Sequence, residues 1–251
     1  MQAIAGASAL VRFGIPLLAV SVGALLVAGV RATSDPAVRR WATLRASFAV
    51  GAVFALTAVL AENGVLADAA RRPPLFMPLM LACLVLAAGT AFSSVGTRLV
   101  AGVPLWLLVG AEGFRLPLEL VMHRAAKDGV MPVEMSYAGY NFDIVTGATA
   151  LALALLIYWG HAPRALVVVW NVLGVVLLAI VIGVAGAGLP WVAAFGPDHV
   201  NEWVLHFPYV WLPTVLVPAA LFGHLLVFRR LPAENAPRKG GEDHALGFFR
   251  S

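Results

Sequence analysis

Apolar runs of about 20 residues recur along the whole chain, and they restrict its fold more than any other feature. An α-helix needs about 20 apolar residues to cross the ~30 Å hydrocarbon layer of a membrane. Of the 251 residues, 61% are hydrophobic and 12% are charged, whereas a soluble domain carries about 25% charged residues. Barrel strands would show alternation over about ten residues, which the sequence lacks. The pattern therefore predicts an all-α, polytopic membrane protein.

The apolar runs predict a seven-transmembrane-helix bundle within residues 1–231. The predicted spans are 9–30, 46–66, 75–95, 102–123, 143–160, 165–188 and 207–228. The stretch "SSVGTRLVAGVP" is expected to be the break between the third and fourth spans. The Gly- and Pro-rich segment 232–251 is predicted to be a disordered cytoplasmic tail. A cleaved signal peptide is the alternative for the first span, although Arg31 interrupts the small residues that a cleavage site requires.

Basic residues are divided unequally between the two sets of predicted loops. Eleven Lys and Arg residues lie on the side of the C-terminus, and five lie on the other side. Because cytoplasmic loops are enriched in Lys and Arg, we expect the N-terminus outside and the C-terminus in the cytoplasm. The net charge of +4 therefore reflects topology, and we expect a lipid bilayer as partner and no nucleic acid.

Several kinds of chemistry are excluded by missing motifs. Cys83 is the single cysteine, so the chain has no intrachain disulfide, CxxC pair or thiolate metal cluster. The chain also lacks the G-x-S-x-G, P-loop and G-x-G-x-x-G motifs. The last predicted span has no lysine, which excludes a retinal-binding photoreceptor.

The fourth span, "LWLLVGAEGFRLPLELVMH", carries four ionisable residues that hydrocarbon would not tolerate. They are Glu112, Arg115, Glu119 and His123. At about 100° per residue they fall within an arc of about 80° and form one polar stripe. A charged residue at the centre of a span costs roughly 2.5–3.5 kcal/mol, so the stripe is expected to face the bundle interior. Pro117 frees the carbonyl of Gly113 within this stripe.

The polar stripe has a structural and a functional interpretation. Arg115 lies three residues after Glu112 and four before Glu119, so two intrahelical ion pairs would lock helix packing. This is the expectation for an assembly or sensory subunit. In the functional interpretation, the stripe lines an outward-facing cavity together with Asn141 and Asp143, which otherwise serve as helix N-caps. The cavity would bind or transport a small polar ligand, a lipid headgroup or protons.

The last outer loop, "FGPDHVNEWVLHFPYVW", gives a second alternative. Asp198 is predicted to cap a helix that places His199, Glu202 and His206 on one arc of about 60°. Histidine and carboxylate ligands suit Zn or Fe, which would make the protein a membrane-embedded metal-assisted hydrolase or lipid-modifying enzyme. The spacing H-x2-E-x3-H differs from the H-E-x-x-H signature, and an amphipathic helix that lies in the membrane interface is the favoured explanation for it. The sequence therefore leaves open whether the protein is an enzyme.

Four segments of the chain resemble a family of uncharacterised bacterial polytopic integral membrane proteins. They are the "FR…EL" pattern from residue 114, "NFDI" at 141–144, "WNVLG" at 170–174 and "FPYVWLPT" at 207–214. The similarity covers roughly the C-terminal 60% of the chain. "SYAGYNFDI" lacks the Glu and Arg of the family form T-F-E-G-R-N-F-D-I. The resemblance implies a bacterial inner-membrane location and no particular activity. It points to Arg115, Glu119, Asn141, Asp143, Trp170, Asn171 and His224.

Overall fold

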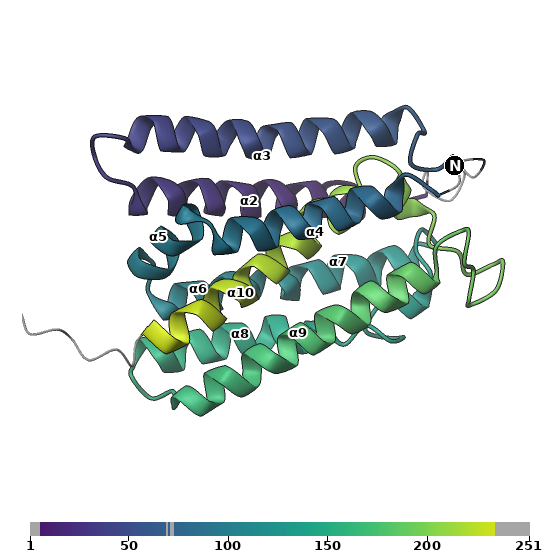
Figure 1. Ribbon diagram of the computed structural model, residues 1–251. Coiled ribbons are helices and arrows are strands. Elements are labelled where there is room, and N and C mark those ends of the chain that lie inside the picture. The colour runs from purple at the N-terminus through teal and green to yellow at the C-terminus, as the bar shows by residue number, and fades with distance from the viewer. Residues whose placement is uncertain (1–5, 69, 71–72, 234–251) are drawn as a thin grey trace, which may run out of the picture.

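The computed structural model describes residues 6–68, 70 and 73–233, and within them all regular structure is helical (Figure 1). The α-helices are α2 (Ala9–Thr33), α3 (Arg39–Glu62), α4 (Phe76–Phe92), α5 (Ser94–Gly102), α6 (Leu105–Ala111), α7 (Arg115–Lys127), α8 (Asp143–Tyr158), α9 (Arg164–Ala187) and α10 (Val217–Ala233). Short 3-10 turns are η1 (Glu112–Phe114), η2 (Val133–Met135) and η3 (Trp203–Leu205), and η4 (Leu212–Leu216) is a π-helical turn. The predicted tail lies, from residue 234 onward, outside the described residues.

The chain is a multi-pass membrane protein by the length and composition of its helices. Four helical stretches in the described part are long and apolar enough to cross a membrane, namely α2, α3, α9 and Leu212–Pro232. A fifth results if α4 and α5, which are bent by 58° relative to one another, form one span. Helix α8 is apolar but shorter, and the predicted fourth span is divided at η1.

The stretch predicted as a break after the third span folds into helix α5 instead. Ser93 ends α4 and caps α5, with its hydroxyl accepting the Val95 N–H. Gly96 allows the sharp bend, because a Cβ there would overlap the Ala91 carbonyl oxygen. Arg229 of α10 donates to that same carbonyl and, at 2.9 Å, to Thr97 Oγ1. The bend is therefore held from a distant helix, which a local pattern does not reveal.

The helices form an elongated bundle in which consecutive connections alternate between its two ends (Figure 1). The segments that join α3 to α4, α7 to α8 and α9 to α10 gather at one end, called here the long-loop end. The α2–α3 and α8–α9 connections and the end of α10 lie at the opposite end. This grouping is the one expected from a chain that repeatedly crosses a membrane.

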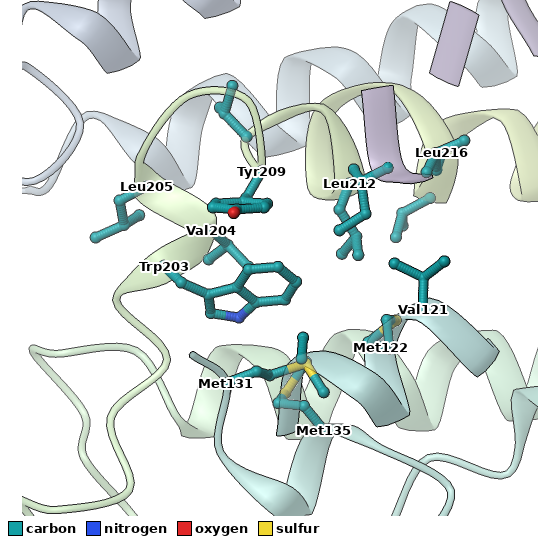
Figure 2. Packing of buried hydrophobic residues seen from close by; sticks show 14 of the residues in the cluster. Val121, Met122, Met131, Met135, Trp203, Val204, Leu205, Tyr209, Leu212 and Leu216 are labelled. Atoms are coloured by element: carbon teal, nitrogen blue, oxygen red, sulfur yellow. The ribbon is translucent and has the colours of Figure 1, made fainter. Parts of the chain in front are cut away.

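Two apolar clusters fill the bundle, one toward each end. The first contains Leu118, Val121, Met122 and Ala125, a helical i, i+3, i+4, i+7 face of α7 that packs under Trp203 and Tyr209 (Figure 2). The rings of Trp203 and Tyr209 lie 4.9 Å apart. The second cluster joins residues of α5, α6, α8, α9 and the last turns of α10, such as Leu226, Val227 and Leu231. In both clusters, buried apolar side chains fill the space between the helices.

Candidate functional site

A network of buried polar side chains lies between the two apolar clusters. On α10, His224 falls between Ala220 of the first cluster and Leu226 of the second; on α9, Asn171 falls between Leu178 of the first and Val167 of the second. Every member exposes 5% or less of its surface. The members are Glu112, Arg115, Glu119, Asn141, Asp143, Thr146, Asn171 and His224. Burial of the stripe was predicted, and for residues 112, 115 and 119 it is confirmed.

A break in the helix positions Arg115 at the centre of this network. Helix α6 ends at Ala111, η1 tightens the next turn, and α7 begins at Arg115. Pro117 therefore lies in the first turn of α7, where a missing N–H costs little. Helix α8 packs directly on this turn, because a Cβ on Gly147 would overlap the backbone of Leu116.

Arg115 forms ion pairs with carboxylates from two elements. Its Nε lies 3.3 Å from Glu112 Oε2, and its Nη1 lies 2.9 Å from Asp143 Oδ1 on α8. The predicted intrahelical pair with Glu112 is confirmed. The predicted pair with Glu119 is wrong, because Glu119 Oε1 instead accepts a hydrogen bond of 2.8 Å from Asn141 Nδ2. Apart from the Glu112–Arg115 pair, the stripe therefore contacts α8 and the loop that precedes it.

Asn141 organises the loop that leads into α8. Its Nδ2 also donates to the Met135 carbonyl at 3.0 Å, and its Oδ1 accepts the Asp143 N–H at 3.0 Å. This side-chain turn starts the helix, as Asn commonly does. Asp143 is the first residue of α8 and Phe142 occupies the cap position, so the N-cap role expected for Asp143 is wrong. Its carboxylate is free to pair with Arg115.

Asn171 and His224 join α9 to α10 through two hydrogen bonds. Asn171 Nδ2 donates to the His224 carbonyl at 3.1 Å, and Asn171 Oδ1 lies 2.8 Å from His224 Nδ1. Because the amide nitrogen is engaged by the carbonyl, Oδ1 accepts and Nδ1 carries the proton. His224 Nε2 then presents a lone pair 4.0 Å from Glu112 Oε2. Asn171 therefore links two helices, as polar residues within membrane helices commonly do.

Glycines bring the helix backbones close to these side chains. A Cβ on Gly223 would overlap Glu112 Oε1, and one on Gly174 would overlap the His224 ring. Neither glycine was singled out in the sequence, nor was Thr146, although each lies one residue or one turn from a polar member. A glycine or threonine at position i−1 or i+3 from a polar residue within an apolar helix is the sequence signal that could have identified these three residues.

A small cavity opens against the charged members of the network. Arg115, Glu119 and Asp143 line it together with apolar side chains from α7, α9, η4 and α10. Its volume is about 20 Å³, enough for about one water molecule. Among the described residues, Arg115 Nη2, Glu119 Oε2 and His224 Nε2 find no hydrogen-bond partner. Each unpartnered buried group costs about 1–3 kcal/mol.

His123 does not join the network. Its ring stacks on Tyr137, with centroids 4.3 Å apart and an interplanar angle of 18°. No hydrogen bond or ion pair connects it to Glu119 in the described structure. His123 was predicted as a ligand-binding residue, and the fold places it one turn further toward the long-loop end.

The three residues predicted to bind a metal do not converge on one point. His199 Nδ1 pairs with Glu134 Oε1 at 2.8 Å, and His206 Nε2 lies 3.7 Å from Glu202 Oε1. Throughout the described ranges, no group of three His, Cys, Asp or Glu side chains is placed to hold a metal ion. The geometry therefore lends no support to Zn or Fe at His199, Glu202 and His206.

The helix expected to begin at Asp198 is not formed. Residues 188–202 run through turns, with positive φ at Ala193 and Gly196, and only η3 follows. Trp203, Val204 and Leu205 are all buried in succession. All three side chains belong to the first apolar cluster.

No protein-family model, curated protein or solved structure matches this chain. The family resemblance drawn from the sequence motifs therefore stays a prediction. Its seven residues nevertheless lie in one place. Six belong to the buried network, and the Trp170 ring lies 5.5 Å from that of His224. The function of the site is inferred from this geometry.

Proposed function

We propose that the chain is a seven-span protein of the bacterial inner membrane whose buried network binds protons reached from the outer face. In this topology the α6–η1–α7 segment and α8 also cross the membrane, joined by the bent α4–α5 pair. The long-loop end faces outward, because the loops at the opposite end hold most of the Lys and Arg residues. The alternating connections in Figure 1 support this arrangement.

Charge balance is the observation that carries the proton-binding proposal. Three carboxyl groups, those of Glu112, Glu119 and Asp143, share one guanidinium, that of Arg115. Fully ionised, the network would bury two uncompensated negative charges at membrane depth, which is very costly. Protons held on the carboxyl groups remove this cost without any change in packing.

The size of the cavity favours protons over larger ligands. At about 20 Å³, it takes about one water molecule. A lipid headgroup or a small organic ligand would first have to displace the apolar side chains that enclose it. A proton, or a proton carried by one water, fits the closed conformation.

Proton entry from the long-loop end is favoured by the position of Glu119. Glu119 hydrogen-bonds Asn141, which belongs to the loop at that end. On the opposite side, the second apolar cluster separates Glu112 and His224 from the start of α6 and the end of α10. The described conformation is therefore suited to binding, and transfer across the membrane would require this second cluster to open.

The proposal predicts a stability that depends on pH through Glu119. Where the folded network holds a proton that the unfolded chain has already lost, a range that begins near pH 4, the free energy of unfolding should fall by about 1.4 kcal/mol per pH unit per proton. Glu119→Gln keeps an acceptor for Asn141 but holds no titrating proton, so its loss of stability with rising pH should be smaller. The measurement is the free energy of unfolding of the purified protein in lipid discs from about pH 4 to alkaline pH.

Glu62→Gln serves as the matched control, because Glu62 is an exposed carboxylate at the end of α3. It should leave the pH profile unchanged. If Glu119→Gln shifts stability equally at every pH, the network is purely structural. The same conclusion would follow if Glu112→Gln and Arg115→Gln lower stability without altering the pH response.

A further inference from the structure

A second cavity lies at the long-loop end, outside the buried network. It is formed by residues 129–133, which follow α7, and residues 198–200, 202 and 203, which precede α10. Its volume is about 340 Å³, within the usual range for sites that bind small organic molecules. It shares no lining residue with the small cavity at Arg115.

The polar side of this second cavity is acidic. Asp198 and Glu202 line it, and both are solvent-exposed. The chain contains no Lys or Arg between Arg164 and Arg229, nor between residues 128 and 163. His199, the other ionisable residue of the lining, is already paired with Glu134 at 2.8 Å. Two carboxylates therefore face the cavity, and none of its lining residues is Lys or Arg; His206 Nε2 lies 3.7 Å from Glu202 Oε1.

Trp203 adds a buried donor without an acceptor. The residue is 2% exposed, and its Nε1 has no hydrogen-bond partner among the described residues. Figure 2 shows the indole nitrogen on the ring edge that faces Met131, which also lines the cavity. A buried N–H without an acceptor is unfavourable. A ligand oxygen that accepts from Trp203 Nε1 would therefore be favoured.

We infer that this cavity binds a small amino alcohol with an apolar substituent. The ammonium group would lie between Asp198 and Glu202, where charge-assisted hydrogen bonds are strong. The hydroxyl oxygen would accept from Trp203 Nε1. The substituent would pack on the apolar wall formed by Val130, Met131, Val133 and Val200. This inference does not depend on proton binding by the buried network.

Three related probes separate the contributions of the two polar groups. Phenylalaninol carries an ammonium and a hydroxyl group, phenylpropylamine only the ammonium, and phenylpropanol only the hydroxyl. Calorimetric titration of the full chain in lipid discs, with empty discs subtracted, should show phenylalaninol binding tightest. Replacing both carboxylates by amides, Asp198→Asn with Glu202→Gln, should weaken its binding by about tenfold or more. Glu62→Gln, an exposed carboxylate at the same end, should leave it unchanged.

The indole contact has its own test. Trp203→Phe keeps an aromatic ring in the cluster but removes the N–H, so phenylalaninol should bind no better than phenylpropylamine does. Binding of phenylpropylamine should be unaffected by this substitution. The inference is overturned if phenylalaninol does not bind, if phenylpropanol binds equally well, or if the double carboxylate variant binds phenylalaninol as the wild type does. Because Asp198 and Glu202 are exposed, the carboxylate test does not depend on a variant that disturbs the core.

Discussion

At the scale of single residues, Arg115 determines whether the buried acids are tolerated. It is the single guanidinium within the described network, and it contacts carboxylates from η1 and α8. Such pairs add little net stability over apolar packing, but removing one partner strands the other charge in a medium of low dielectric constant. The burial of residues 112, 115 and 119 followed from this energetic argument at the sequence level. The functional interpretation also placed Asn141 and Asp143 beside the stripe. It did not predict that Asn141 pairs with Glu119 and Asp143 with Arg115, because these partners lie 22 and 28 residues apart in the sequence.

Arg115→Gln should lower the free energy of unfolding by about 3–5 kcal/mol, because it leaves Glu112 and Asp143 without a cation. Adding Asp143→Asn to this variant should restore part of the loss, since one stranded carboxylate is then removed. Chemical unfolding in mixed micelles measures both effects. The control is Arg124→Gln, whose exposed pair with Asp128 is worth about 1 kcal/mol or less. Equal losses in the two single variants would argue against a special role for Arg115.

At the scale of helices, the sequence predicted the uninterrupted elements well and the broken ones poorly. Helices α8 and α9 begin and end within two residues of their predicted limits, because each is one apolar run with Asn or Pro at its start. The α4–α5 bend and η1 depend on Arg229 and on packing against α8, which are contacts between distant segments. The loop before α10 was misassigned because its apolar spacing fits a helix, whereas Trp203, Val204 and Leu205 are held by packing against distant residues of the first apolar cluster.

Asp128 connects two helices and gives a prediction for acid pH. It follows α7, and its carboxylate accepts the N–H of Ser8, the cap residue of α2, at 3.0 Å. Hydrogen bonds from Ser8, helped by Arg124, hold the pKa of Asp128 below its usual range. Its stabilisation is therefore complete above the unfolded pKa of about 3.9 and is lost as pH falls through the lower folded value.

Asp128→Asn should accordingly destabilise the protein at neutral pH, and the difference from wild type should shrink as the pH falls below about 4. Thermal unfolding of both proteins over that range measures the difference. A gap between the two proteins that stays constant down to the lowest pH would show that Asp128 acts through its shape and not through its charge.

At the scale of the whole molecule, the proposed topology determines which side would supply protons. All three long connections gather at one end of the bundle (Figure 1), and Asn141 links that end to Glu119. Composition was sufficient to predict a polytopic helical protein. The position of the closed clusters was not predictable, because it depends on how Trp203 and Tyr209 fold back over α7.

Cysteine labelling in intact bacteria tests the proposed orientation. With the buried Cys83 replaced by Ala, Tyr140→Cys should react with a membrane-impermeant maleimide, because Tyr140 is exposed at the long-loop end. Val38→Cys, exposed in the α2–α3 connection, should react only after the cells are opened. The reverse pattern would place the long-loop end in the cytoplasm and would contradict outward access.

Infrared spectroscopy of the carboxyl groups tests most directly whether the buried network holds protons. In lipid at neutral pH, the wild-type protein should show the carbonyl stretching band of protonated carboxylic acids, shielded from exchange with bulk water. The band should weaken in Glu119→Gln and in Glu112→Gln and remain in Glu62→Gln. A wild-type spectrum without that band at neutral pH, or a band that all three variants leave intact, would contradict proton binding at this site.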